Sequence, residues 1–217
     1  MQRIMNGLYA VVGSGKECNI YIIDGEVIVD AGTGNEFARV KEFAEKNRMS
    51  PHTLVNTHYH YDHTGGNAKL RDLLKCAIAI HEQDADYIKR GETLAEIFGE
   101  SARASSADLL LEEGDKIETR NFSFEVLHTP GHTKGSICLY EKEKKILISG
   151  DTVFDGAVGR TDLPGGSSEQ LWSSMGRLSD FPVDFLLPGH GPVKVSGVQL
   201  MIRQMLAMRR MEQKARV

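Results

Sequence analysis

One short segment, residues 57–66 (THYHYDHTGG), constrains this chain more than any other. It holds three histidines and an aspartate within six positions: His58, His60, Asp62 and His63. An apolar stretch typical of a strand precedes it, and a helical pattern follows it at 67–75. Imidazole nitrogens and carboxylate oxygens are common ligands of zinc and of related divalent metals. The segment therefore predicts a metal site on a loop between a strand and a helix, in a protein of the α/β class.

The spacing within this segment indicates more than one ion. In an extended backbone, alternate side chains point the same way, so His58 and His60 can share an ion. Asp62 continues that alternation, whereas His63 needs a turn. A catalytic zinc usually takes three protein ligands and keeps one position open for water, so four ligands are too many for it. We predict a second ion beside the first, bound by Asp62 and His63.

Two ions need further ligands, and three later residues are candidates because each follows the end of a predicted strand. These are His132 in TPGHT, Asp151 in SGDT and His190 in LPGHG. Enzymes built on layered sheets commonly place their chemistry on such strand-end loops. We predict that these three side chains converge on the histidine-rich loop.

With these residues in this order, the chain resembles the metallo-β-lactamase superfamily from residue 30 (the start of Asp-Ala-Gly) to residue 191. The resemblance implies an αββα sandwich, which is a four-layer α/β fold, with the metals at one edge. It also implies a role for each ligand. One ion would take His58, His60 and His132; the other would take Asp62, His63 and His190; and Asp151 would bridge them.

The subgroup is indicated by Asp151, which stands where glyoxalase II-like members carry a bridging aspartate. Several true β-lactamases use a cysteine ligand instead, and no cysteine lies near a ligand motif in this sequence. The stretch 159–162 (GRTD) is similar to small glyoxalase II-like hydrolases and to persulfide dioxygenases. Full-length glyoxalase II has a C-terminal helical domain that helps to hold glutathione. Only residues 191–217 follow His190 here, so we expect that clamp to be absent.

The resemblance implies a hydrolase that cleaves a thioester, as hydroxyacylglutathione hydrolase does, or a related ester. Water activated between two divalent ions would attack the carbonyl carbon. Asp151 would hold the ions together, and Asp62 would orient the attacking oxygen. Zinc is the expected metal, with iron and manganese as alternatives. A second hypothesis is an iron-dependent persulfide dioxygenase. A third is a non-enzymatic metal-binding module, which predicts a broken ligand set.

Residues around the ligands leave several roles open. Arg160 could bind a substrate carboxylate, or it could pair with Asp162. Tyr59 could contact substrate, or it could pack beneath the loop. We interpret Asp30 as a turn residue or as an orienter of a metal ligand. Residues 82–107 look partly helical and are interpreted as an excursion over the active site.

Composition and charge limit the kinds of partner and the cellular location that we expect for this protein. A formal net charge of −4 gives no basic excess for nucleic acid or a membrane surface. Basic residues gather only near the C-terminus, which we interpret as the solvated face of a last helix: Arg203, Arg209, Arg210, Lys214 and Arg216. No signal peptide or bilayer-length apolar run is evident. Three cysteines without a CxxC pair indicate free thiols and a cytoplasmic protein. We expect one domain over residues 1–217. Its substrate is expected to be a small molecule, and the protein could form a homo-oligomer.

Local patterns predict the remaining elements. An Asp-Gly pair at 24–25 predicts a hairpin between strands at 18–23 and 26–29. Ser167 and Gln170 fit the start of a helix that runs to about residue 178. The last helix is predicted to pack through an apolar face: Val198, Met201, Ile202, Met205 and Met208. Other strands are expected at 8–12, 53–56, 77–80, 116–118, 122–127, 136–140, 145–149 and 184–187, and another helix at 37–44.

Overall fold

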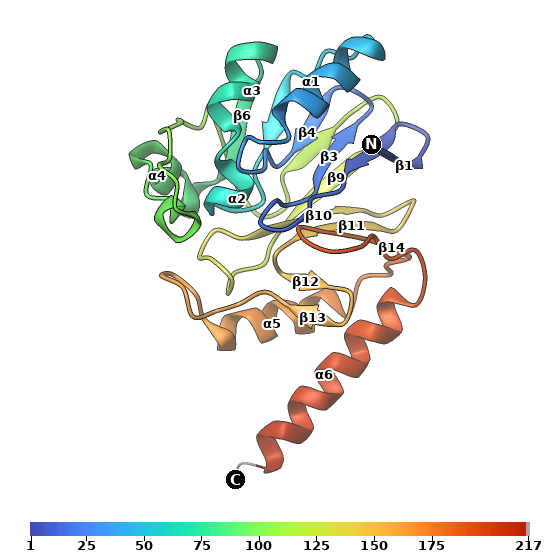
Figure 1. Cartoon of the computed structure of the whole chain (residues 1–217). Coiled ribbons are helices and arrows are strands. Elements are labelled where there is room, and N and C mark those ends of the chain that lie inside the picture. Colours follow the sequence, from blue (N-terminus) through green and yellow to red (C-terminus); the bar gives the residue numbers. More distant parts are fainter. Residues whose placement is uncertain (216–217) are drawn as a thin grey trace.

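Two β-sheets lie face to face at the centre of the molecule, with helices on both outer sides (Figure 1). The structure is a computed structural model, and it describes residues 1–215. Helices α1 and α3 cover the upper side in Figure 1, and α5 lies along the lower side. This arrangement confirms the predicted αββα sandwich. Arg216 lies outside the described residues, so its predicted place on the last helix is not tested.

The first sheet carries the N-terminal half of the chain. Its strands, in spatial order, are β1 (Gln2–Met5), β2 (Leu8–Val11), β3 (Ile20–Ile23), β4 (Val27–Val29), β5 (Thr53–Val55), β6 (Ala77–His81) and β7 (Leu109–Leu111). Strands β1 to β4 are antiparallel, and β4 to β7 are parallel. Parallel neighbours need crossover connections. These contain α1 (Phe37–Lys46), α2 (Tyr61–Thr64), α3 (Asn67–Leu74), α4 (Glu82–Arg90) and the 3-10 turn η1 (Ala95–Phe98).

The second sheet carries the C-terminal half. Its spatial order is β14 (Phe185–Pro188), β11 (Ile146–Gly150), β10 (Ile137–Glu141), β9 (Ser123–His128) and β8 (Lys116–Glu118). Only the β11–β14 pair is parallel, and α5 (Ser168–Leu178) lies in the connection between these strands. A small hairpin, β12 (Val153–Phe154) with β13 (Ala157–Val158), follows β11. The chain ends in α6 (Val198–Ala215).

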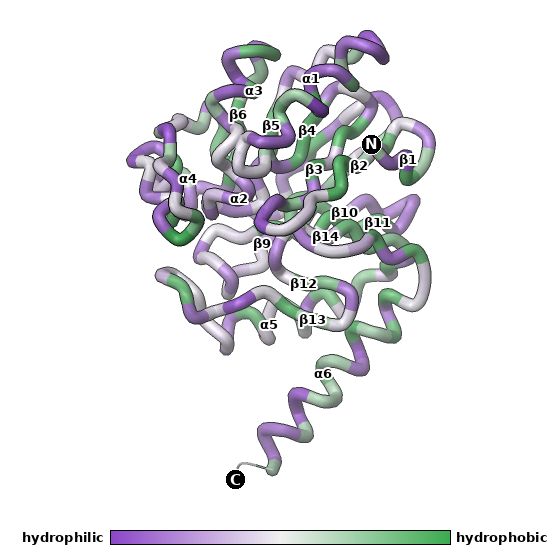
Figure 2. Tube along the Cα trace, in the orientation of Figure 1, coloured by the Kyte–Doolittle hydropathy of each residue, from purple (hydrophilic) through white to green (hydrophobic). Residues whose placement is uncertain are grey.

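Three apolar clusters hold the four layers together. The first lies between the sheets and includes Val29, Phe124 and Ile148. The second joins the outer face of the first sheet to α1, α3 and α4. The third joins the second sheet to α5 and α6. Because both faces of each sheet are covered, central strands such as β3, β4 and β11 are buried along their whole length and are apolar rather than alternating. Figure 2 shows this as green along the central strands.

Most predicted elements are confirmed, and the differences have local causes. The hairpin at residues 24–25 forms as expected, and the side chain of Ser167 caps α5 by accepting from the backbone N–H of Gln170. Strands β1 and β7 and the β12–β13 hairpin are missing from the prediction because they are too short to show a period. Met208 was expected in the core and is 63% exposed, because α6 projects beyond the body of the protein (Figure 1). Among residues 1–215, no helix has the length and apolar character required to span a bilayer.

Candidate metal centre

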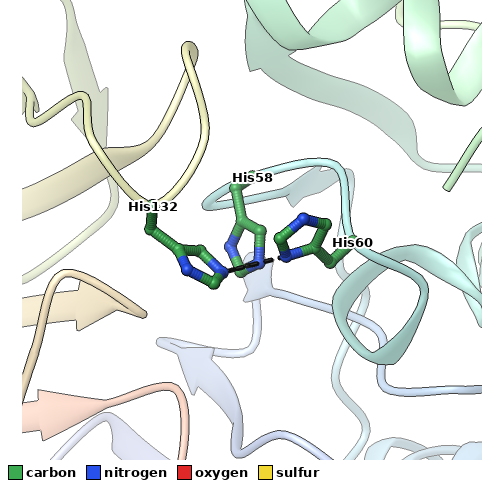
Figure 3. A group of neighbouring side chains, drawn as sticks. All are labelled: His58, His60 and His132. Carbon is green, nitrogen blue, oxygen red and sulfur yellow. Dashed lines mark hydrogen bonds between the residues drawn. The ribbon is translucent and has the colours of Figure 1, made fainter. Parts of the chain in front are cut away.

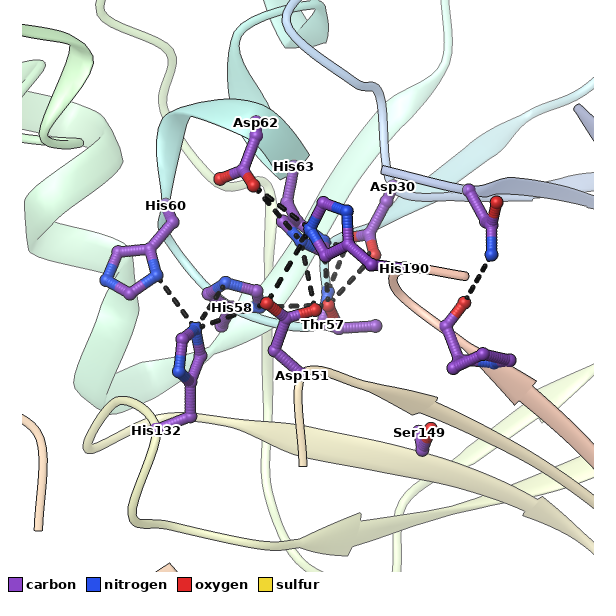
Figure 4. A network of polar contacts seen from close by, with 12 residues as sticks. Asp30, Thr57, His58, His60, Asp62, His63, His132, Ser149, Asp151 and His190 are labelled. Carbon is purple, nitrogen blue, oxygen red and sulfur yellow. Dashed lines mark hydrogen bonds and ion pairs between the residues drawn. The ribbon is translucent and has the colours of Figure 1, made fainter. Parts of the chain in front are cut away.

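Four loops bring the predicted ligands to one edge of the sandwich (Figure 4). His58 and His60 follow β5, and one turn of helix, α2, redirects the chain so that Asp62 and His63 face the same centre. The other loops follow strands of the second sheet. His132 lies between β9 and β10, Asp151 follows β11, and His190 follows β14. The structure therefore brings together all seven residues that the sequence indicated.

The first group consists of His58, His60 and His132, drawn in Figure 3. The Nε2 atom of His132 lies 2.9 Å from Nδ1 of His60 and 3.2 Å from Nε2 of His58. All three side chains are buried. Burial, with the neighbouring histidines, lowers the pKa of His58 well below its ordinary value. Burial lowers the pKa of His60 to about 3. Both rings are therefore neutral near pH 7, which is the form that binds a metal.

The second group consists of Asp62, His63 and His190. The Nε2 atom of His190 lies 3.1 Å from Oδ2 of Asp62 and 3.3 Å from Nε2 of His63. Asp151 stands between the two groups. Its Oδ2 lies 3.6 Å from Nε2 of His132 and 3.7 Å from Nε2 of His190. One carboxylate therefore faces a ligand from each group.

The donor set fits metal ions. Oδ1 of Asp151 is buried without a hydrogen-bond partner, and ring nitrogens of three histidines face one another. A proton can lie between a pair of such nitrogens, but it cannot satisfy a third. Burial acts to raise the pKa of Asp151, but His63, His132 and His190 lower it below its ordinary range overall. An ionised carboxylate, together with the neutral rings of His58 and His60, is a suitable environment for divalent cations.

Asp30 is confirmed as an orienter of a candidate ligand. Its Oδ2 atom lies 2.8 Å from Nδ1 of His63, and its Oδ1 atom accepts a hydrogen bond from the backbone N–H of Thr57 at 2.8 Å. A bond at Nδ1 leaves Nε2 of His63 free to face the second group. Asp30 also has a φ of 62°, in the left-handed region, at the point where the chain leaves β4.

A second support, which the sequence analysis missed, holds the loop of His190. The side-chain amide of Asn19 donates to the carbonyls of Pro188 and Gly191, both at 2.9 Å. The hydroxyl of Tyr21 donates to the same Pro188 carbonyl at 2.7 Å. Asn19 is buried, and nothing in its local sequence distinguishes it from a loop residue.

The two predicted substrate contacts have different outcomes. Tyr59 is 1% exposed, its ring stacks on Tyr87, and its hydroxyl donates to the Pro164 carbonyl at 2.9 Å. This packing leaves no surface for a substrate, so the expectation of a substrate contact is wrong for Tyr59. Arg160 forms a two-bond ion pair with Asp162, at 2.8 and 2.6 Å. Arg160 also lines the cavity beside the metal centre, so the pairing does not remove it from the site.

Cys18 is closer to the centre than its sequence position suggests. Its sulfur, an oxygen of Asp30 and a ring nitrogen of His63 all lie within 4.8 Å of one another. Burial raises the pKa of the Cys18 thiol to about 12. Metals bind the thiolate, so a thiol that stays protonated is a poor ligand. The expectation that no cysteine lies near a motif therefore holds in the sequence but not in space.

Comparisons with known proteins identify the family. The family model described as "Metallo-beta-lactamase superfamily" matches residues 13–190, so the chain belongs to that superfamily. A probable metallo-hydrolase of Methanocaldococcus jannaschii is 34% identical over 191 residues, covering 83% of this chain and 91% of that protein. The human acyl-coenzyme A thioesterase MBLAC2 is 30% identical over 214 residues, covering 82% of this chain and 74% of the human protein. The crystal structure of TTHA1623 in a di-iron-bound form has a TM-score of 0.77 and 30% identity, covering 88% and 96% of the two chains.

Proposed function

We propose that this protein is a metal-dependent hydrolase of thioesters that uses two divalent ions. The observation that carries the proposal is the position of Asp151 between two complete ligand groups beside an open cavity. Four of the seven ligands reach that cavity: His60, Asp62, His132 and Asp151. Zinc is the proposed metal, and iron is the main alternative because TTHA1623 binds two irons.

The chain's own residues support this chemistry. When bound, the ions would supply an activated water and a positive charge for the carbonyl oxygen. Burial raises the pKa of Asp62, but His63 and His190 lower it overall, so Asp62 is ionised at neutral pH. Because Asp62 lines the cavity, it can accept a hydrogen bond from the attacking water and orient it. Asp30 fixes the ring of His63 during this step.

The cavity wall indicates the kind of acyl group. Apart from the candidate ligands and Arg160, the lining is apolar and comes from the excursion at 82–107 and from the loop after β13: Leu94, Ile97, Phe98 and Leu163. Ile97 is 51% exposed although it is apolar, which is typical of a surface that a ligand covers. We therefore propose an apolar acyl chain. The similarity to an acyl-coenzyme A thioesterase supports the same class.

A panel of acyl thioesters tests the proposal directly. We expect the metal-loaded protein to release free thiol from medium-length acyl thioesters, with lower kcat/KM for acetyl and hydroxyacyl thioesters. Thiol release is read with a chromogenic reagent, and a β-lactam and a simple ester serve as comparison substrates. If no thioester is cleaved while both metals are fully loaded, the proposed reaction is wrong.

Ile97→Ser tests the apolar wall. Fully burying an aliphatic side chain contributes about 1.5–3 kcal/mol, and a ligand can bury only the exposed half of Ile97, so KM for a medium-length acyl thioester should rise by roughly four- to twelve-fold. KM for the acetyl thioester, which is too short to cover the wall, should change by less than about two-fold. Leu110→Ser is the matched control, because Leu110 is 59% exposed and does not line the cavity. Equal effects on short and long chains would argue against a specificity role.

The other two hypotheses are separated from this proposal by measurement. The candidate ligands also resemble those of persulfide dioxygenases, which hold a single iron, so one iron per chain together with oxygen consumption on a persulfide would favour that reaction instead. A non-enzymatic module predicts a broken ligand set, and all seven ligands are present.

We also propose a reducing compartment such as the cytoplasm, because all three cysteines are free and buried.

A further inference from the structure

Asp84 is a buried carboxylate with no role in the site described so far. It lies in the first turn of α4 and is fully buried, at 0% exposure. A carboxylate removed from water is costly unless hydrogen bonds satisfy its oxygens. Asp84 accepts three, from the backbone N–H of Tyr59 at 3.1 Å, the hydroxyl of Thr133 at 2.7 Å and the backbone N–H of Gly135 at 2.8 Å.

These donors belong to the two loops that carry the first ligand group. Tyr59 lies between His58 and His60, and Thr133 follows His132 directly. One loop follows β5 of the first sheet, and the other joins β9 to β10 of the second. Asp84 therefore links the two sheets at the point where the three histidines meet. Gly135 has to be glycine there, because a Cβ atom would lie 2.6 Å from Cγ of Asp84.

The second ligand group has other supports. Asp30 holds His63, and Asn19 holds the loop of His190. Within residues 1–215, the side chain of Asp84 makes no hydrogen bond to α2 or to the loop at 188–191. Asp30 also accepts from the backbone N–H and the hydroxyl of Thr57, beside the first group, so it supports both groups. Asp84, in contrast, bonds only to the loops of the first group, and Asn19 holds only the loop of the second.

We propose that Asp84 is a positioning residue that determines the metal affinity of the three-histidine group, independently of the second group. The proposal rests on the two-ion centre proposed above, but not on its thioesterase activity. Polar groups behind metal ligands typically change affinity by about ten- to a hundred-fold when they are replaced. Asn at this position keeps the shape but places an NH₂ where one oxygen accepts, so an N–H donor would lose its partner.

The test measures metal binding at each site in metal-free protein titrated with cadmium. Cadmium NMR gives a separate signal for an ion held by three nitrogens and for one held by a carboxylate with two nitrogens. Competition with a chromogenic chelator then gives the two affinities. For Asp84→Asn we expect affinity at the three-histidine site to fall by at least about ten-fold, and affinity at the second site to stay within about two-fold. Asn19→Ala is the matched variant and should show the reverse pattern.

Thr133→Val is a second variant that tests the same proposal if Asp84→Asn does not fold. It removes one donor to Asp84 and leaves the two backbone donors in place. A smaller loss of affinity at the same site is expected. Equal losses at both sites, or an unchanged three-histidine site in a folded variant, would overturn the proposal. Because the measurement does not involve substrate, an inactive but correctly loaded protein would count against the thioesterase function and not against the role of Asp84.

Discussion

Replacing Asp151 by asparagine should reduce kcat/KM for an acyl thioester by at least about a thousand-fold, which corresponds to about 4 kcal/mol of transition-state stabilisation. Asp151 is the only ligand among the described residues that stands between the two groups, 3.6 Å from His132 and 3.7 Å from His190. Asparagine preserves the shape of the side chain but removes its negative charge. Two cations held close together by a neutral amide would repel each other more strongly, so the pair would be lost or displaced.

The fold should survive this substitution, and that separates catalysis from stability. Circular dichroism of Asp151→Asn should match that of the parent protein without metal, while the urea midpoint should fall, because the lowered pKa of Asp151 means that its ionised form stabilises the fold. Asp155→Asn is the matched control, because Asp155 lies nearby in the β12–β13 turn, is 39% exposed in its side chain and pairs with Lys194 at the surface. Its activity should change by less than about two-fold, as is usual for surface ion pairs. A variant of Asp151 that keeps both metals and more than a tenth of the activity would contradict the bridging role.

The set of candidate ligands could be predicted because its strongest part is local. His58, His60, Asp62 and His63 fall in one loop, and their spacing alone indicates two ions. His132, Asp151 and His190 converge only because distant parts of the chain meet. Their positions at the ends of predicted strands allowed us to expect this convergence, but no local pattern encodes it. The resemblance to a family supplied the assignment of ligands to ions. The layered fold was likewise predicted from the family resemblance. Local patterns could not supply it, because short buried strands such as β4 show no alternation of apolar and polar residues.

The supports behind the ligands were not predictable, for a physical reason. Asp84 lies on a polar helix and looks like a solvent-facing acid, yet its oxygens point inward to donors about 25 and 50 positions away in the chain. The role of Asn19 is hidden in the same way, because the backbone carbonyls to which its side chain donates lie beyond residue 187. Hydrogen bonds of this kind depend on which loops meet, and no local period encodes that. Tyr59 shows the opposite error: its place between two ligands suggested a substrate contact, whereas its ring points away into packing.

Removing the metals should lower thermal stability as well as abolish activity. The ions bind the folded centre, and an ion present at about 1,000 times its dissociation constant adds about 4.1 kcal/mol to stability. For a domain of this size each kcal/mol corresponds to about 2–4 °C, so chelation should lower Tm by roughly 8–16 °C for each such site. The ligands come from both sheets, so the ions join elements that are otherwise held together mainly by the apolar layer between them. Scanning calorimetry before and after dialysis against a chelator measures the shift, and added zinc should restore both Tm and activity.

His58→Ala makes this prediction specific to the centre. The variant lacks one ligand of the first group, so its Tm should fall by only about half as much on chelation, since one of two comparable sites is lost. His52→Ala is the control, because His52 is exposed and hydrogen-bonded only to Thr53 through its side chain, and it should behave like the parent protein. A parent protein whose Tm and activity are both unchanged after complete removal of metal would show that the seven side chains form a structural polar cluster. The ionised Asp151 would then be stabilised by the histidines around it, and the hydrolase proposal would have no remaining support.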